Sequence, residues 1–113
     1  MKKITVLGVT GSIGQQTVDV VVHHRDEFEI VAMSAGRNID ALEEIMKQLN
    51  VSHICVQNKE DKENLENKYK DCHFYYGQDG LMTIATLPEV EIVLNAIVGF
   101  AGLLPTMEAI KAH

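Results

Sequence analysis

Three glycines near the start of the chain are spaced so that they could hold a phosphate group. The segment Gly8–Gly14 has the sequence GVTGSIG, follows a short β-branched run and precedes a segment with helical periodicity. A strand, a glycine-rich turn and a helix in this order are the context that a phosphate-binding turn requires. The free backbone amides at Ser12 and Ile13 would then point at the phosphates, with the positive end of the helix dipole behind them.

Each glycine of this turn has a separate expected task. Gly8 allows a tight turn, Gly11 lets a pyrophosphate approach the backbone, and Gly14 lets the helix pack closely against the strand. The spacing is GxxGxxG, one residue longer than the GxGxxG of the strict dinucleotide fingerprint. A plain tight turn is the alternative. Thr10 and Ser12 could cap the helix and still face a phosphate. The position of the turn within a strand–helix–strand unit favours dinucleotide binding.

A second informative segment, Gly36-Arg37-Asn38, follows the next predicted strand. NAD-preferring sites usually place an acidic residue here to hold the ribose hydroxyls, but no carboxylate occurs before Asp40. Arg37 stands 23 positions beyond Gly14. Its planar, permanently charged guanidinium suits a 2′-phosphate, and Asn38 can add neutral hydrogen bonds. The alternative is a solvated loop cation; together with the glycine turn, Arg37 predicts NADPH as the preferred cofactor.

These residues need a scaffold, and the apolar pattern predicts one. The predicted strands are short apolar or β-branched runs at Ile4–Leu7, Phe28–Ser34, His53–Gln57, His73–Tyr76 and Glu91–Asn95. The predicted helices run from Ser12 to about His24, from an N-cap at Asp40 through Leu49, and over Lys59–Lys70, Leu81–Leu87 and Pro105 to Ile110. Such alternation predicts an α/β fold with a Rossmann-type doubly wound parallel sheet. We expect a single three-layer α/β/α domain over residues 1–113.

The composition fits an ordinary globular domain and argues against several classes of protein. Of 113 residues, 46% are hydrophobic and 23% charged. The formal net charge of −6 argues against nucleic-acid or membrane-surface binding, but is compatible with a local phosphate site built from backbone amides. The apolar run after Lys2 and Lys3 meets Gly8 too early for a signal-peptide core. We therefore expect a cytoplasmic protein with no nucleic-acid or membrane partner.

The residue types that most often bind metals are not spaced for that task. Cys55 and Cys72 are 17 positions apart, without a CxxC pair or a matched histidine spacing. Cys55 lies in an apolar run, where a cysteine usually behaves as a small buried residue. The adjacent His23 and His24 point in different directions on a helix and make a poor metal pair. We therefore predict no metal ligand in this chain.

Three motifs taken together resemble one known family. They are the turn Gly8–Gly14, the segment Ala35–Asn38, and Asn95–Gly99 followed by Gly102–Thr106. In this order and at these separations, with Asp19-Val20 in the first helix, they resemble the N-terminal domain of the 1-deoxy-D-xylulose 5-phosphate reductoisomerase family. The resemblance covers the whole chain and is more specific than the glycine turn alone.

The resemblance implies which residues bind the cofactor. In the family, the positions that match Thr10–Ile13 and Gly36–Asn38 lie on NADPH, and a lysine also occurs at the Arg37 position, which keeps the positive charge. The segment after Asn95 would approach the cofactor from the carboxyl end of its strand. The candidate cofactor-binding residues are Gly8, Thr10, Gly11, Ser12, Ile13, Gly14, Gly36, Arg37, Asn38, Ala96, Ile97, Val98 and Gly99.

The resemblance also implies the activity of a longer enzyme. Such an enzyme rearranges a phosphorylated ketose and reduces the aldehyde intermediate with NADPH to 2-C-methyl-D-erythritol 4-phosphate, in non-mevalonate isoprenoid synthesis. It uses magnesium or manganese and works as a homodimer. The family's asparagine-lysine-glutamate segment, acidic metal ligands, substrate-phosphate site and lid belong to the part beyond His113. Because hydride transfer needs a carbonyl held near the nicotinamide and polarised by the metal, we assign no catalytic residue here and expect the chain alone to be inactive.

Two other functions fit the glycine turn. The NADPH domain of aspartate-semialdehyde dehydrogenase also begins with a GxxGxxG turn, but it lacks the combination of Gly36–Asn38 and Gly102–Thr106 at these positions. The other is a stand-alone NAD(P)-sensing regulatory module. An acidic residue after the second strand, or an appended DNA-binding segment, would favour that module, and the sequence has neither. Because sheets of this kind serve many functions, the fold alone does not separate these alternatives.

Overall fold

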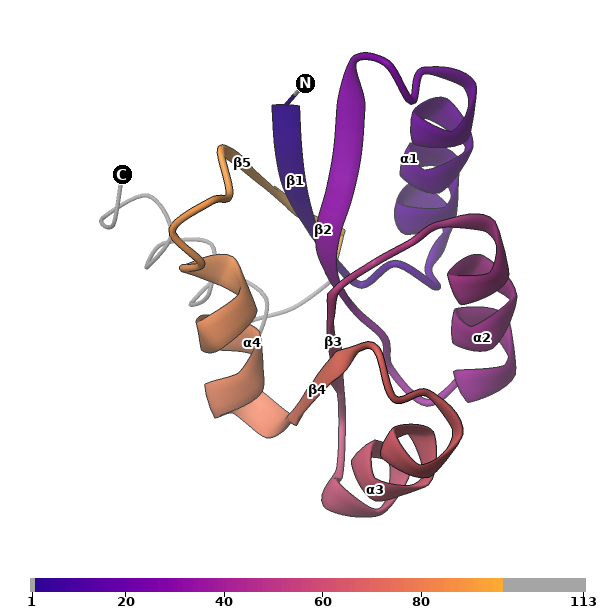
Figure 1. Cartoon of the computed structure of the whole chain (residues 1–113), viewed down its shortest axis with the longest axis vertical. Helices are drawn as coiled ribbons and strands as arrows, with labels where there is room; N and C mark the ends of the chain where they lie inside the picture. Colours follow the sequence, from indigo (N-terminus) through magenta and orange to yellow (C-terminus); the bar gives the residue numbers. More distant parts are fainter. Residues whose placement is uncertain (1, 97–113) are drawn as a thin grey trace.

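The computed structural model describes residues 2–96, which alternate between strands and helices (Figure 1). The strands of this part are β1 (Lys2–Leu7), β2 (Phe28–Ser34), β3 (His53–Val56), β4 (His73–Tyr76) and β5 (Ile92–Asn95). The helices are α1 (Ser12–His23), α2 (Ile39–Gln48), α3 (Lys59–Lys68) and α4 (Gly77–Ala85). Neighbouring strands are parallel, in the order β4-β3-β2-β1-β5. The predicted doubly wound α/β fold is confirmed.

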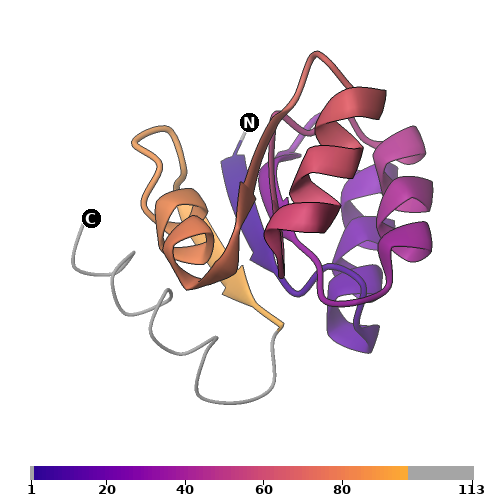
Figure 2. The ribbon, with the colours of Figure 1, turned by 90° about the horizontal axis from the view of Figure 1, so that it is seen from below.

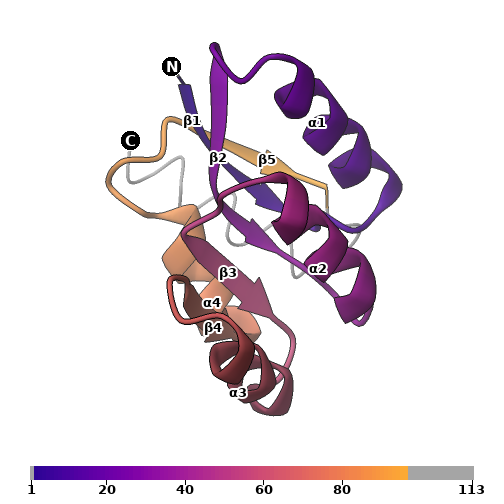
Figure 3. The same ribbon diagram turned by 45° about the vertical axis from the view of Figure 1, so that its right-hand side comes forward.

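The helices form the two outer layers of this fold. Helices α1, α2 and α3 lie side by side on one face of the sheet, and α4 lies on the other (Figures 2 and 3). The chain moves outward from β1 to β4 and then returns through α4 to place β5 on the other side of β1. Because crossovers between parallel strands are right-handed, this reversal of direction puts α4 on the opposite face.

Each face of the sheet carries its own apolar core. The larger core joins the sheet to α1, α2 and α3, and includes Ile4, Val6, Val18, Val21, Leu42, Ile45, Ile54 and Leu65. The smaller core lies on the α4 side and consists of Leu7, Ala32, Cys55 and Ile84. Strand β2 is buried from Ile30 to Ser34, as a central strand covered on both faces must be.

Helix α2 is capped by Asn38, so the predicted N-cap at Asp40 was wrong. The side-chain oxygen of Asn38 accepts a hydrogen bond from the Ala41 N–H at 3.1 Å. Both residue types are good N-caps, and the helix begins two residues earlier than the pattern suggested. Asp40 lies instead in the first turn, where a carboxylate interacts favourably with the helix dipole.

Helix α4 begins at Gly77, four residues before the predicted start at Leu81. Two glycines in this first turn lower the helix propensity, which made the segment resemble a loop. Gly80 is required by packing, because a Cβ there would lie 2.8 Å from Cys55 Sγ and 2.9 Å from Tyr75 Cβ. The glycine thus lets α4 approach β3 and β4 closely.

The other boundaries within residues 2–96 agree with the predicted ones to about two residues. The last predicted helix, from Pro105 to Ile110, lies outside the described residues. No helix in the described part of the chain is long and apolar enough to cross a membrane.

Candidate functional site

The carboxyl ends of the parallel strands lie along one edge of the sheet, and the predicted site residues within residues 2–96 lie there. Strand β1 lies between β2 and β5, with Val6 paired with Met33 and Leu7 with Asn95. The crossovers that serve the two sides of β1 lie on opposite faces of the sheet (Figure 1). In parallel sheets, ligands bind outside the carboxyl ends of the strands at such a reversal point. The glycine turn follows β1 at this point.

The turn is held by the end of β2. Gly8 has a φ of 82°, which a glycine adopts without strain. Its N–H donates to Ser34 Oγ at 2.8 Å, and the Val9 N–H donates to the Ser34 carbonyl oxygen at 2.8 Å. The Gly11 N–H donates to the Gly8 carbonyl oxygen at 3.3 Å and closes the turn. The predicted tight turn at Gly8 is confirmed.

Gly14 and Gly11 differ in what the fold requires of them. A Cβ at Gly14 would lie 2.6 Å from Val9 Cα and would also collide with the Gly8 carbonyl oxygen. The prediction that Gly14 permits close helix packing is therefore confirmed. A Cβ at Gly11 would make only an ordinary contact, 3.6 Å from the Gly8 oxygen, and the φ of −79° suits any residue. Packing within the described chain does not require glycine at position 11.

The N-terminus of α1 presents unpaired backbone donors. Gly11 is the N-cap, and no backbone acceptor in residues 2–96 receives the N–H groups of Ser12, Ile13 or Gly14. The first turn contains no acidic side chain, and no side chain caps it. The expected capping of this helix by the side chains of Thr10 or Ser12 is therefore wrong. Three amides and the positive end of the dipole remain for an anion.

The residues after β2 lie at the same edge of the sheet. A Cβ at Gly36 would have Gln57 Nε2 as its nearest neighbour, at 3.7 Å, so this position is also open. Arg37 is exposed, and its side chain makes no hydrogen bond or ion pair with other described residues. Asn38 uses its side-chain oxygen to cap α2, which leaves its NH2 group for a ligand.

A cavity of about 450 Å³ opens between the carboxyl ends of β1, β2 and β3 and the start of α4. Its lining residues are Gly8, Ser34, Ala35, Gly36, Val56, Gln57, Gly77, Gln78 and Leu81. Gly8 and Gly36 are the predicted site residues in this set. Sequence reasoning missed Ser34, Gln57 and Gln78, although their positions at strand ends or in the next helical turn are the signal that could have identified them.

Ala96 connects the end of β5 to the glycine turn. Its N–H donates to the Leu7 carbonyl oxygen at 2.7 Å, so the pairing of β5 with β1 continues to the residue before the turn. Of the predicted residues after β5, Ile97, Val98 and Gly99 lie outside the described residues, as does the segment Gly102–Thr106.

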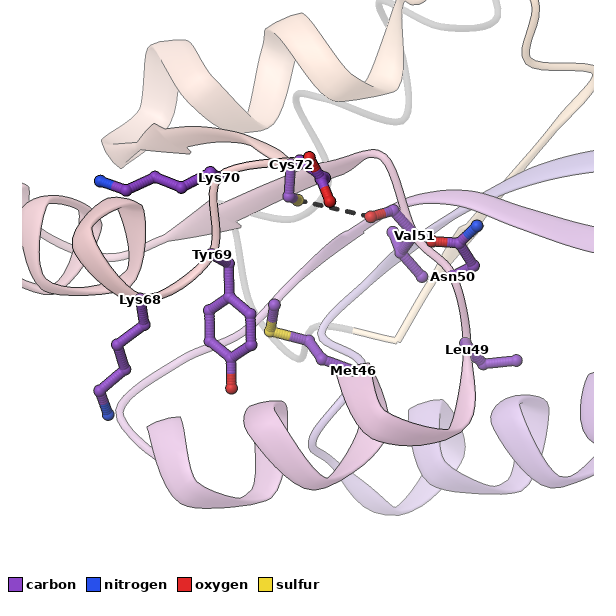
Figure 4. A pocket seen from close by; sticks show the side chains of 9 residues that line it. Met46, Leu49, Asn50, Val51, Lys68, Tyr69, Lys70 and Cys72 are labelled. Carbon is purple, nitrogen blue, oxygen red and sulfur yellow. Dashed lines mark hydrogen bonds between the residues drawn. The ribbon is translucent and has the colours of Figure 1, made fainter.

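A second cavity, of about 300 Å³, lies at the opposite edge of the sheet, between α2 and the segment after α3 (Figure 4). Met46 and Tyr69 face each other across it, whereas Lys68 and Lys70 point away. Lys68 Nζ is paired with Glu43 Oε1 at 3.1 Å. Because its cations are turned outward, this cavity is a weaker candidate for an anionic ligand than the edge with the glycine turn.

The described residues favour binding over nucleophilic or metal chemistry. No three His, Cys, Asp or Glu side chains of residues 2–96 are close enough to hold a metal ion. Burial raises the pKa of the Cys55 thiol to about 12 and that of the Cys72 thiol to about 11, which keeps both protonated near neutral pH. His53 Nδ1 lies 3.0 Å from the Tyr75 hydroxyl, and burial lowers the histidine's pKa, but His53 begins β3, at the opposite edge from the glycine turn.

Solved structures of known enzymes share this fold. A DOX-P reductoisomerase in complex with NADPH, fosmidomycin and magnesium superposes with a TM-score of 0.92 at 30% sequence identity, covering 99% of this chain and 28% of that one. The 1-deoxy-D-xylulose 5-phosphate reductoisomerase from Zymomonas mobilis in complex with NADPH has a TM-score of 0.88 at 29% identity, with 98% of this chain and 30% of that one covered.

Curated relatives show the same similarity in their sequences. The reductoisomerase of Clostridium perfringens (strain SM101 / Type A) is 42% identical over 115 residues, and that of Bacillus cereus (strain Q1) is 45% identical over 112. These matches cover 98% and 99% of this chain, which spans about 30% of the length of either relative. The model of the 1-deoxy-D-xylulose 5-phosphate reductoisomerase family matches residues 4–113. The chain therefore belongs to the 1-deoxy-D-xylulose 5-phosphate reductoisomerase family.

Proposed function

We propose that this chain binds NADPH at the edge formed by the glycine turn, the start of α1 and the end of β2. The start of α1 carries this proposal: three backbone N–H groups there have no backbone acceptor in the described residues. The pyrophosphate of a dinucleotide supplies acceptors for these donors and a charge that the helix dipole favours. Two solved relatives with this fold are complexes with NADPH.

Gly11 and Gly36 support close approach of the ligand to the backbone. An added Cβ at either residue would meet other atoms of the chain only at 3.6 Å or more. Because neither glycine is needed for packing, we attribute both to the space that the cofactor occupies. Thr10, Ser12 and Ile13 complete the turn around the pyrophosphate.

Arg37 provides the preference for NADPH over NADH. Its exposed guanidinium, unpaired with other described residues, can form a charge-assisted hydrogen bond with the 2′-phosphate. The NH2 group of Asn38 adds a neutral donor beside it. A charge-assisted bond contributes about 1.5–3 kcal/mol, which corresponds to roughly 10- to 150-fold in affinity.

The remaining parts of the cofactor extend in both directions from the turn. The cavity of about 450 Å³ takes the adenine, with the apolar side chains of Val56 and Leu81 as walls and the amide of Gln57 at the rim. The nicotinamide extends toward the end of β5, where Ala96 follows the strand. We keep Ile97, Val98 and Gly99 in the proposed cofactor site on the basis of the family motif.

The longer relatives suggest the reaction that this domain serves. We propose that the chain is the cofactor domain of a cytoplasmic, homodimeric enzyme that isomerises and reduces a phosphorylated ketose. NADPH supplies the hydride, and the residues of this chain bind and orient it. A relative also contains magnesium. On the basis of the family resemblance, we place the ligands for magnesium or manganese, and the catalytic residues, in the part of the relatives that this chain does not span.

Replacing Gly11 with Asp separates binding from folding. Aspartate is a good N-cap, and position 11 has room for a side chain, so the variant should unfold at the same temperature as the wild type or higher. Its carboxylate would occupy the helix N-terminus and repel the pyrophosphate, which should raise the NADPH Kd by more than about tenfold.

Val20→Ala is the matched control for this substitution, because Val20 is exposed on the same helix and distant from the turn. Its NADPH affinity, measured by calorimetry, should equal that of the wild type. Unchanged affinity in Gly11→Asp would show that the cofactor does not bind at this turn.

A further inference from the structure

We propose that Ser34 is a positioning residue that couples the glycine turn to the bound nucleotide through its buried hydroxyl. The inference rests on the proposed NADPH site and adds a residue that belongs to neither the glycine turn nor the Arg37 segment. Ser34 is the last residue of β2 and is only 2% exposed.

Ser34 holds the first two residues of the turn. The Gly8 N–H donates to its hydroxyl oxygen at 2.8 Å, and the Val9 N–H donates to its carbonyl oxygen at 2.8 Å. Gly8 is the residue with positive φ on which the direction of the turn depends. The path of the backbone toward Gly11 and the start of α1 is therefore set by Ser34.

The Ser34 hydroxyl also has a proton that it can donate. A serine hydroxyl accepts up to two hydrogen bonds and donates one, and Ser34 uses its oxygen for Gly8. No acceptor within residues 2–96 receives its proton, whereas the other buried hydroxyl in the core, Thr5, donates to the Ile84 carbonyl oxygen at 2.9 Å. A buried donor without an acceptor costs free energy. We therefore expect the Ser34 hydroxyl to donate its proton to an acceptor on the ligand.

The cavity at the carboxyl edge supplies the place for that acceptor. Ser34 lines it together with Gly8 and Gly36, between the turn proposed for the pyrophosphate and the segment proposed for the 2′-phosphate. An oxygen on the phosphate–ribose backbone of the nucleotide is the acceptor that fits this position. The same hydroxyl then accepts from the turn and donates to the ligand, and each bond polarises the other.

Calorimetric titration of the chain with NADPH tests this role. Ser34→Ala removes both hydrogen bonds of the hydroxyl and should raise the NADPH Kd about tenfold or more. Ser34→Thr keeps the hydroxyl on a strand-favouring residue and should restore the Kd to within about threefold of the wild-type value. The matched control is Thr5→Val, which removes a buried hydroxyl that donates to the Ile84 carbonyl oxygen and not to the turn, and should leave the NADPH Kd unchanged.

A second readout follows the turn without the cofactor. In the free chain, the Gly8 amide should exchange its hydrogen faster in Ser34→Ala than in Ser34→Thr, because only the latter keeps its acceptor. If Ser34→Ala does not fold, Ser34→Cys replaces it and should bind NADPH more weakly than Ser34→Thr.

The outcomes separate this inference from the proposed function. Wild-type binding of NADPH together with wild-type affinity in Ser34→Ala would overturn the role of Ser34 alone. Failure of the folded wild-type chain to bind NADPH would overturn both.

Discussion

Glycine serves different purposes at different positions of the candidate site. Gly8 adopts a positive φ, and Gly14 leaves space for the backbone of Val9, whereas Gly11 and Gly36 do neither. A glycine that neither conformation nor packing requires points to something outside the chain, and a phosphate is what the N-terminus of α1 suits. Substitutions at these positions should therefore affect folding and binding separately.

Gly14→Ala should destabilise the fold strongly. The added Cβ would meet backbone atoms at 2.6–2.7 Å, and backbone cannot move aside as a flexible side chain can, so we expect the free energy of unfolding to fall by about 3 kcal/mol or more. Gly11→Ala, where the space is open, should cost less than about 1 kcal/mol. Equal losses in urea unfolding of the two variants would contradict the packing role of Gly14.

Arg37→Ala should lower the affinity for NADPH and leave that for NADH unchanged. Only NADPH carries the 2′-phosphate, so the ratio of the two Kd values should shrink by roughly 10- to 150-fold. The control is Arg25→Ala, because this other arginine donates to the Gln48 carbonyl oxygen, on the α1–α2 side of the fold. An unchanged NADPH/NADH ratio in Arg37→Ala would show that another residue determines cofactor choice.

The buried thiol of Cys55 predicts a loss of stability in alkali. Burial raises its pKa from 9.0 to about 12, so between these pH values the unfolded chain loses this proton while the folded chain keeps it. Below pH 9, the Cys55 thiol should therefore not change the free energy of unfolding. Above pH 9, it should lower the free energy of unfolding by at most about 1.4 kcal/mol per pH unit. Chemical unfolding at pH 8 and pH 10.5 measures the slope, and Cys55→Ala should have a flatter one; identical slopes would exclude the thiol as the cause.

At the scale of secondary structure, two neighbouring polar residues at the start of α2 should contribute differently to stability, because only one of them caps the helix. Asn38→Ala should destabilise the protein by about 1 kcal/mol, because it removes the acceptor for the Ala41 N–H. Asp40→Ala should cost only a few tenths of a kcal/mol, since Asp40 interacts with the helix dipole without capping. Urea unfolding of the two variants compares them directly, and a larger loss in Asp40→Ala would contradict the observed cap.

Strands and most helices were predictable because their burial dictates their composition. Strand β2 is central and covered on both faces, so it contains the unbroken apolar run Ile30–Met33, and its bounds were predicted correctly. Helix α4 was predicted to begin four residues too late because its first turn contains two glycines, which weaken a helix. Gly80 is explained only by its contacts with β3 and β4, and Gly77 by its positive φ of 72°. Such tertiary contacts are not visible in a local pattern.

The part of the candidate site that consists of backbone groups was predictable from the sequence. The part that consists of side chains from separate elements was not. The turn at Gly8–Gly14 carries its own signal, because conformation requires glycine at position 8 and packing requires it at position 14. Ser34, Gln57 and Gln78 come together only through the pairing of β2, β3 and β4, since Gln78 lies in the helix that follows β4. No spacing along the chain indicates that Ser34 accepts a hydrogen bond from Gly8, 26 residues before it.

At the scale of the whole molecule, the doubly wound topology determines where the proposed cofactor site lies. The reversal at β1 places α1, α2 and α3 on one face of the sheet and α4 on the other (Figure 2), and it leaves the carboxyl edge between them open to a dinucleotide. The net charge of −6 opposes an anionic cofactor at long range, so the proposed site depends on the local donors at α1 and on Arg37 for its affinity.

Calorimetric titration of the wild-type chain with NADPH and, in parallel, with NADH tests the central claim most directly. The structure predicts saturable binding of NADPH and affinity for NADH that is weaker by roughly tenfold or more. Circular dichroism on the same sample establishes that the chain is folded. A folded chain that binds neither nucleotide, or binds both equally, would contradict the assignment of the glycine turn and Arg37 as an NADPH site.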